Sequence, residues 1–307
     1  MQAFEIHKQI IDDYKEYLSS FNIIRDERIK SIVDKAFREQ HYIPEPLIQF
    51  NPSFERAADF KALIKEGVIH PNIEKTFGDF HLFVHQEMAL RLGTAGNSFV
   101  VTSGTGSGKS LTFLGTIFDF IFRNPDKKGL KAVLVYPMNA LINSQEEEID
   151  KFAKRFGHDF PITYNKYTGQ ESEEKRREIE ANPPDIILTN YMMLELILTR
   201  AREQYMRDSF ADNLRFLVFD ELHTYRGRQG ADVALLIRRL KSICKNELIC
   251  IGTSATMISG EDVEDSKQVV ADFASLIFSE TFEPGQVVEE ALENSTIFNG
   301  KLPTAFD

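Results

Sequence analysis

Short apolar runs rich in β-branched residues recur along this chain from about residue 76, and stretches with helical periodicity separate them. The runs are SFVVT, KAVLVY, ITYNKY, DIILT, LRFLVF and LICIG. They are nearly continuous in apolar residues, which is typical of parallel strands covered on both faces. Because such strands alternate with helices, for example at 109–123 and 142–156, the pattern predicts an α/β fold with a mostly parallel, doubly wound sheet.

The first 75 residues follow another pattern. Residues 1–42 have apolar positions at helical spacing and predict two amphipathic helices. The proline-rich stretch YIPEPLIQFNPSF then predicts an extended connector. A further short helix is expected around ERAADFKALIKEG, ending at Gly67. We therefore expect an N-terminal helical extension over 1–75, the α/β domain over 76–280, and a polar segment over 281–307 without an obvious element.

Composition excludes some classes of protein. The chain has 307 residues, 42% of them hydrophobic and 27% charged, with a net charge of −11. No apolar run approaches the roughly 18 residues that span a bilayer, and the N-terminus resembles neither a signal nor a transit peptide. We expect a cytoplasmic protein without a membrane partner, in which Cys244 and Cys250 are buried thiols. The negative charge does not exclude nucleic acid, because binding depends on local patches.

The run FVVT leads into the loop SGTGSGKS and then into the helix predicted at 109–123. A glycine-rich loop before a helix points backbone N–H groups at a phosphate. In such a loop Lys109 would reach the β- and γ-phosphates of ATP, and Ser110 would coordinate Mg²⁺. The usual pattern G-x-x-x-x-G-K-[ST] has glycine where this chain has Ser103. The predicted nucleotide-binding residues of the loop are Ser103, Gly104, Thr105, Gly106, Ser107, Gly108, Lys109 and Ser110.

A second apolar run ends in acidic residues, in LVFDELH at 217–223. A buried strand would deliver Asp220 and Glu221 to its carboxyl end, where the ligands of α/β sheets bind. Asp220 would hold Mg²⁺, and Glu221 would orient and deprotonate the attacking water. The two motifs together predict Mg²⁺-dependent hydrolysis of ATP.

These residues resemble superfamily 2 helicases of the DEAD/DEAH-box type, and the resemblance runs from about residue 77 to 260. The family's D-E-x-H box matches Asp220, Glu221 and His223. The resemblance implies a RecA-like P-loop NTPase lobe with ATP and Mg²⁺ as cofactors. It also implies that Lys109 and the three residues of the box are catalytic.

Two further family motifs contribute to the expected nucleotide site. The Ser-Ala-Thr motif, which couples hydrolysis to domain movement, matches Ser254, Ala255 and Thr256. The upstream glutamine that reads adenine matches Gln86 in LFVHQEMAL. An amide side chain can donate and accept hydrogen bonds at once, which suits the edge of adenine.

The family's nucleic-acid-contacting motifs have counterparts in YPMNALINSQ, YTGQ and ILTNYMML. The chain departs from the family where Pro-Met replaces the usual Pro-Thr, and where Thr-Asn replaces the Thr-Pro of many relatives. Such residues would hold a strand by its backbone without reading its sequence. The matching residues are Pro137, Asn139, Asn143, Thr168, Gly169, Thr189 and Asn190.

The stretch DELHTYRGRQGADVALLIRRLK is similar to the branch that contains the mitomycin-repair helicase and its fungal relatives, and to helicases of bacterial anti-phage systems. That branch implies an ATP-driven 3′-to-5′ translocase on DNA, so DNA is expected over RNA. Four arginines of the stretch would either bind the nucleic-acid backbone or brace the lobe: Arg226, Arg228, Arg238 and Arg239.

Motors of this superfamily need two RecA-like lobes, and the second lobe supplies arginines to the γ-phosphate. No second glycine- and arginine-rich motif follows Thr256. We expect one lobe at 76–280 and a linker at 281–307 towards a second lobe, on a longer chain or on a partner chain. Repair or defence proteins would be further partners. The alternatives are an RNA helicase lobe and a nucleotide-gated assembly subunit of a defence complex.

Overall fold

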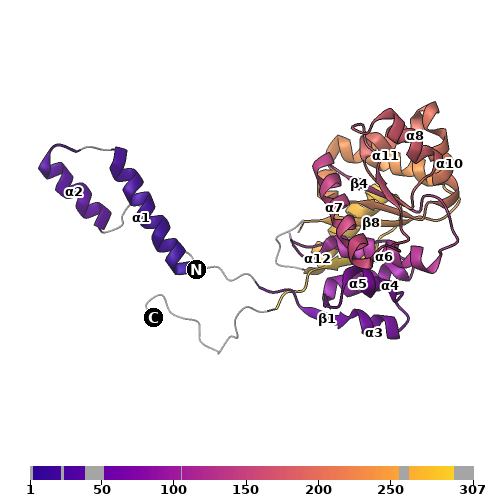
Figure 1. Ribbon diagram of the computed structural model, residues 1–307, viewed down its shortest axis with the longest axis horizontal. Coiled ribbons are helices and arrows are strands. Elements are labelled where there is room, and N and C mark those ends of the chain that lie inside the picture. Colours follow the sequence, from indigo (N-terminus) through magenta and orange to yellow (C-terminus); the bar gives the residue numbers. More distant parts are fainter. Residues whose placement is uncertain (1–2, 22–23, 39–51, 105, 256–262, 294–307) are drawn as a thin grey trace. The chain divides into compact units, whose positions relative to one another are not determined.

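The computed structural model describes residues 3–21, 24–38, 52–104, 106–255 and 263–293 (Figure 1). The chain divides into two compact units, Met1–Asn51 and Pro52–Asp307. In the first unit, α1 (Ala3–Phe21) and α2 (Glu27–Arg38) are the two predicted helices. Several large apolar side chains of α1 are exposed, among them Phe4 and Ile10. No helix among the described residues is long and apolar enough to cross a membrane.

The second unit is built on a seven-stranded sheet in which every pairing is parallel. The predicted fold class is confirmed. The order across the sheet is β5-β6-β4-β7-β8-β3-β9. In that order the strands are Tyr164–Lys166, Ile186–Asn190, Ala132–Tyr136, Phe216–Phe219, Ile249–Ser254, Phe99–Thr102 and Val287–Glu289.

Helices cover both faces of the sheet (Figure 1). Consecutive side chains of a strand point to opposite faces, so Val101 packs into one core cluster and Val100 into the other. One face packs against α3 (Phe60–Lys65), α4 (Asn72–Phe77), α5 (Val84–Thr94), α6 (Lys109–Arg123) and α7 (Asn139–Phe156). The other packs against α8 (Glu173–Ala181), α9 (Tyr191–Thr199), α10 (Gln204–Asn213), α11 (Gly227–Ile243) and α12 (Val263–Phe278). Single 3₁₀ turns lie at Ala201–Glu203, Leu222–Thr224 and Pro284–Gln286.

The helix predicted around 55–67 is only half right. Its first residues form β1 (Arg56–Asp59), which pairs antiparallel with β2 (His81–Phe83). The helix α3 begins after Asp59, whose side chain accepts a hydrogen bond from the backbone N–H of Ala62 at 2.8 Å. Strand pairing with distant residues therefore overrides the local helical pattern up to that cap. As predicted, the segment stops at Gly67, which has a φ of 77°.

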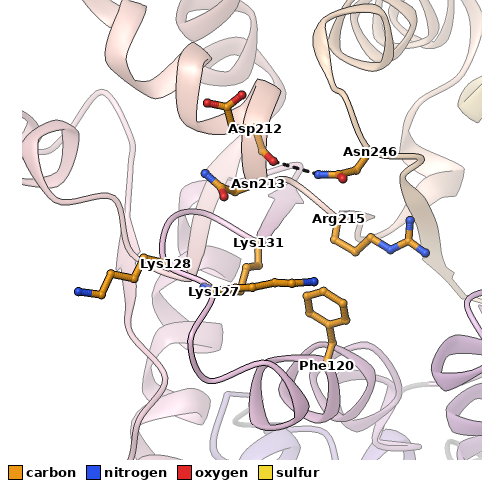
Figure 2. A pocket seen from close by; sticks show the side chains of 8 residues that line it. All are labelled: Phe120, Lys127, Lys128, Lys131, Asp212, Asn213, Arg215 and Asn246. Atoms are coloured by element: carbon orange, nitrogen blue, oxygen red, sulfur yellow. Dashed lines mark hydrogen bonds between the residues drawn. The ribbon is translucent and has the colours of Figure 1, made fainter.

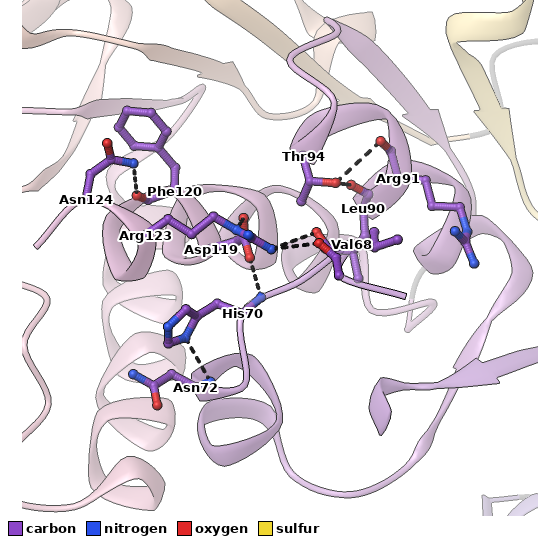
Figure 3. A network of polar contacts seen from close by, with 11 residues as sticks. Val68, His70, Asn72, Leu90, Arg91, Thr94, Asp119, Phe120, Arg123 and Asn124 are labelled. Atoms are coloured by element: carbon purple, nitrogen blue, oxygen red, sulfur yellow. Dashed lines mark hydrogen bonds and ion pairs between the residues drawn. The ribbon is translucent and has the colours of Figure 1, made fainter. Parts of the chain in front are cut away.

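A buried carboxylate ties the chain after α3 to helix α6 (Figure 3). Asp119 is 3% exposed, and it accepts hydrogen bonds from the backbone N–H of His70 at 2.6 Å and from Nε of Arg123 at 2.8 Å. Nη2 of Arg123 continues the network to the backbone oxygens of Gly67 and Val68. A buried carboxylate needs such partners, so this network fixes the segments before α5 against the helix that follows the glycine-rich loop.

Candidate functional site

The glycine-rich loop joins the carboxyl end of β3 to the first turn of α6, as the sequence predicts. Gly106 and Gly108 have φ values of 80° and 72°, which residues other than glycine rarely adopt. A Cβ at Gly108 would also lie 2.5 Å from Nε2 of Gln86. The loop therefore depends on glycine here both for its backbone conformation and for the close approach of Gln86. Thr105 lies outside the described residues.

Lys109 lies over this loop. Its Nζ donates hydrogen bonds to the backbone oxygens of Ser103 at 2.8 Å and Gly104 at 3.1 Å. The hydroxyls of Ser103 and Ser107 are 2.5 Å apart and close the loop beneath it. Within the described part of the chain, no carboxylate forms an ion pair with Lys109. Its positive charge is therefore available at the mouth of the loop.

Two side chains at the start of α5 hold the far side of the loop. Oε1 of Gln86 accepts a hydrogen bond from the backbone N–H of Phe83 at 3.0 Å, and its Nε2 donates to the oxygen of Ser107 at 3.1 Å. Nε2 of the neighbouring His85 lies 2.9 Å from the same oxygen. Burial lowers the pKa of His85, although its contact with the Ser107 oxygen acts in the opposite direction. Both ends of the Gln86 amide are thus engaged with backbone groups, one of them in the loop.

Asp220 and Glu221 follow the carboxyl end of β7, at the same edge of the sheet as the loop. Between them and β3 runs β8, whose Thr253 hydroxyl donates to Oδ1 of Asp220 and accepts from the backbone N–H of Glu221 at 3.2 Å. Burial raises the pKa of Asp220 above its ordinary value, while Thr253 and Lys109 oppose that rise. Glu221 has a φ of 54°, unusual for a residue with a side chain. A strained acidic residue at a strand end is typical of a functional site.

His223 links this acidic pair to the end of β8. Its Nδ1 is 3.1 Å from Oγ of Ser254 and 3.2 Å from Oε2 of Glu221. That Glu221 oxygen is buried and has no partner with hydrogen-bond geometry. Because such an atom carries an unmet demand for a donor, it is suited to receive one from a bound molecule. Thr256, the last residue of the Ser-Ala-Thr motif, lies outside the described residues.

Ser110 and Asp220 are suited to hold Mg²⁺ only together with a phosphate ligand. Oγ of Ser110 donates to Oε1 of Gln145 on α7 at 3.2 Å. Among the described residues, no group of three or more His, Cys, Asp or Glu side chains could hold a metal alone. Mg²⁺ is commonly bound by one or two carboxylates plus substrate phosphates, and the remaining ligands are water. One hydroxyl and one carboxylate at this edge fit that arrangement.

The predicted nucleic-acid contacts also lie at the carboxyl edge, where β4, β5 and β6 end. Nδ2 of Asn190 donates to Oδ1 of Asn139 at 2.9 Å, and Nζ of Lys166 donates to Oδ1 of Asn143 at 3.1 Å. Pro137 is partly exposed and Gly169 is exposed. Thr168 and Thr189 are buried, at 2% and 0% exposure. Their hydroxyls bond to backbone groups of nearby residues. Thr189 donates to the oxygen of Tyr167 at 2.7 Å, and Thr168 accepts from the N–H of Gln170 at 3.2 Å.

The four arginines after the acidic motif divide into two pairs. Arg226 and Arg228 are exposed at the start of α11. Nε of Arg238 donates to Oγ of Ser279 at 2.6 Å, and Nη2 of Arg239 lies 3.0 Å from Oε1 of Glu195. The second pair therefore braces α11 against its neighbours. The first pair has side chains at the surface beside the site.

A pocket of about 480 Å³ opens at the opposite edge of the sheet and is rich in basic side chains (Figure 2). Two of these cations already have partners: Nζ of Lys131 forms an ion pair with Asp185 at 2.5 Å and bonds to the oxygen of Gly129 at 3.0 Å, and Arg215 bonds to the oxygen of Glu247. Helices α6 and α10 end here, and helix carboxyl ends carry partial negative charge. The residues that line this pocket belong to none of the predicted nucleotide-binding or nucleic-acid motifs.

The comparison with protein families decides the classification. Residues 83–265 match the model of the DEAD/DEAH box helicase family. The chain belongs to this family. An uncharacterized ATP-dependent helicase of Methanocaldococcus jannaschii is 34% identical over 66% of this chain and 28% of its own length. The Druantia protein DruE of Escherichia coli is 24% identical over 88% of this chain and 21% of its own.

Solved structures agree with this classification. The DUF1998 helicase MrfA, bound to DNA and AMPPNP, superimposes with a TM-score of 0.65 and 25% identity over 82% of this chain and 33% of that one. The chain spans between 21% and 28% of the length of the first curated relatives that it matches. Members of the family are ATP-dependent helicases, so nucleotide use is a family property.

Three residues of the site escaped the sequence analysis. Thr253 was overlooked because the apolar run LICIG suggests an earlier strand end, whereas β8 continues through Ser254. Gln145 lies in YPMNALINSQ, but nothing in the sequence shows that α7 brings it to Ser110. His85 contacts the loop at Ser107, and the only sequence feature that points to it is its position next to Gln86, which matches a family motif.

Replacement of Asp220 by asparagine is expected to stabilise the nucleotide-free protein near neutral pH, by roughly 1 kcal/mol. The folded pKa of Asp220 is raised by burial, so folding favours the protonated form. Protonated Asp220 therefore contributes to the free energy of unfolding. This contribution is complete below the pKa of Asp220 in the unfolded chain, and it is lost as the pH rises through its pKa in the folded chain. Asparagine keeps an acceptor for Thr253 and carries no charge. Thermal unfolding at neutral and acidic pH measures the effect, with the exposed Asp232→Asn as the control. A lower melting temperature for Asp220→Asn at neutral pH contradicts this account.

Proposed function

We propose that this chain is the ATP-binding lobe of a superfamily 2 DNA helicase or translocase, which couples ATP hydrolysis to movement on DNA. The observation that carries the proposal is the meeting of Lys109, Asp220 and Glu221 at one edge of one sheet. Their strands β3 and β7 are separated only by β8. A cation, a magnesium-type carboxylate and a second carboxylate are the groups that phosphoryl transfer to water requires.

Each group has a distinct role in the proposed reaction. The N–H groups of the loop and Nζ of Lys109 bind the β- and γ-phosphates, and Lys109 leaves its present carbonyl partners to do so. Ser110 and Asp220 would hold Mg²⁺, which when bound would neutralise charge on the phosphates. Glu221 orients the attacking water and accepts its proton, and His223 lies beside its carboxylate, with Nδ1 at 3.2 Å from Oε2. The Gln86 amide positions the loop in the present structure, and it would leave Phe83 and Ser107 to bind adenine.

DNA is the proposed nucleic acid because a relative with the same lobe, MrfA, has been solved with DNA bound. The strand would lie over the carboxyl ends of β4, β5 and β6. Asn139, Asn143, Gly169 and Asn190 would contact its backbone, while Thr168 and Thr189 support the loops from beneath. Arg226 and Arg228 would add positive charge beside it. The proposed role is in DNA repair or anti-phage defence, because the stretch DELHTYRGRQGADVALLIRRLK resembles helicases of those systems.

A second RecA-like lobe, on a longer chain or on a partner chain, completes the proposed motor. That lobe would supply the arginines that stabilise charge in the transition state, which are worth about 10³–10⁵ in rate. We therefore expect the 307-residue chain to bind nucleotide loosely and to hydrolyse it slowly. Robust DNA-stimulated turnover by this chain as a monomer would refute that part of the proposal.

Binding to labelled single-stranded DNA, duplex DNA and RNA of one sequence tests the choice of nucleic acid. Fluorescence anisotropy with AMPPNP and Mg²⁺ should show tighter binding to DNA than to RNA, weakened by Arg226→Ala and Arg228→Ala. Arg238→Ala serves as the control, because that side chain bonds to Ser279. Tighter binding to RNA would favour the RNA helicase alternative. If the chain bound none of the three nucleic acids, and if the Lys109→Ala variant still formed a complex with partner proteins, the alternative of an assembly subunit in a defence complex would be favoured.

A further inference from the structure

The glycine-rich loop already holds an anion from its own chain. The carboxylate of Glu290, the residue after β9, accepts a hydrogen bond from the backbone N–H of Gly104 at 2.7 Å. Glu290 is 186 residues away in sequence, so neither motif nor spacing links it to the loop. Backbone N–H groups of such a loop are the donors that bind phosphate oxygens. The carboxylate of Glu290 therefore occupies one backbone N–H group of this loop.

We propose that Glu290 is a positioning residue of the nucleotide site, whose carboxylate occupies the loop N–H of Gly104 until a nucleotide phosphate displaces it. The inference rests on the proposed function, since it takes the loop to be a phosphate site. Lys109 is folded onto the oxygens of Ser103 and Gly104 in the same structure. The start of the loop is therefore contacted by one carboxylate, at the N–H of Gly104, and by one ammonium, at the oxygens of Ser103 and Gly104.

Neighbouring contacts make this carboxylate part of a larger connection. The chain after Glu290 pairs with the segment before β1, through Glu55 N–H to the Ala291 oxygen at 2.8 Å and Glu293 N–H to the Ser53 oxygen at 2.8 Å. Phe54, between those two, packs on the rings of Phe83 and His85 at 5.1 Å and 5.6 Å. His85 in turn contacts the loop at Ser107. Displacement of Glu290 would therefore also affect the backbone pairing of Ala291 and Glu293 with the segment before β1.

Charge gives the direction of the effect. Glu290 places a negative charge on the loop, and a triphosphate bound there would bring further negative charge. Repulsion between like charges at a partly exposed site is modest and is screened by salt. Removing the charge of Glu290 should therefore tighten nucleotide binding, whereas a purely structural anchor would weaken binding when it is removed.

Glu290→Gln tests the inference because glutamine keeps the size and an acceptor oxygen but loses the charge. Titration of the 307-residue chain with a fluorescent ATP analogue should show binding roughly twofold to fivefold tighter than in the wild type. The gain should shrink as salt is raised. Glu290→Ala should also bind tighter, with a melting temperature lower by roughly 2 °C without nucleotide because the loop loses its partner.

Glu289→Gln is the matched control. The adjacent carboxylate faces Ser266 at 3.1 Å and Lys267 at 3.9 Å rather than the loop, so its replacement should leave the affinity unchanged. Unchanged or weaker binding in Glu290→Gln, or an equal gain in Glu289→Gln, overturns the inference. The proposed function has its own test. If Lys109→Ala, with Glu290 unchanged, bound nucleotide as well as the wild type does, the loop would not be the phosphate site.

Discussion

Replacing Lys109 by alanine is expected to remove most of the affinity of the chain for ATP. The ammonium is the cation at the mouth of the loop, and it forms no carboxylate pair within the described residues, so its charge is available to the phosphates. Truncating one partner of a hydrogen-bonded charge pair costs on the order of 2–5 kcal/mol. Titration with a fluorescent ATP analogue in the presence of Mg²⁺ measures the loss.

Lys127→Ala provides the matched control for this experiment. Lys127 lines the basic pocket at the opposite edge of the sheet, with its Nζ 5.3 Å from the centre of the Phe120 ring (Figure 2). Its removal should leave nucleotide affinity unchanged. If Lys127→Ala weakened binding and Lys109→Ala did not, the nucleotide would bind at the other edge and the proposed site would be wrong.

Replacing Glu221 by glutamine should preserve ATP binding and remove hydrolysis. A positioned general base contributes about 10²–10⁴ to a rate, and glutamine cannot accept the proton of the attacking water. Its shape is nearly that of glutamate, and the backbone N–H of residue 221 still bonds to Thr253. Single-turnover measurement with saturating ATP separates the chemical step from binding.

Glu195→Gln is a suitable control, because that carboxylate pairs with Arg239 and should not affect turnover. Hydrolysis by Glu221→Gln at the wild-type rate would show that another group activates the water. Loss of binding together with hydrolysis would instead assign Glu221 to holding the nucleotide or its metal.

The parts of the fold predicted well are those in which local pattern and tertiary packing agree. Helix α6 spans Lys109–Arg123, as the apolar run after the loop predicts. Helix α7 spans Asn139–Phe156, so it starts three residues before the predicted start at residue 142. Strand β1 was predicted as helix, since its pairing with β2 is a contact between residues far apart in sequence.

The candidate site divides in a similar way. The loop, Gln86 and the acidic motif each occupy a short stretch with recognisable spacing, so the sequence places them together through the topology of a parallel sheet. Thr253, Gln145 and Glu290 contact these motifs only through folding. Their residue types are common and their spacing is arbitrary, so no sequence pattern singles them out. The roles given to the motif residues stay predictions until nucleotide is bound.

A structure of this chain determined with AMPPNP and Mg²⁺ tests the central proposal most directly. The proposal predicts the γ-phosphate beside Nζ of Lys109 and the metal between Ser110 and Asp220, with the phosphates against the loop N–H groups. Nucleotide at the opposite edge of the sheet, or a loop that stays closed with Lys109 on its own carbonyl oxygens while the nucleotide binds elsewhere, would contradict it.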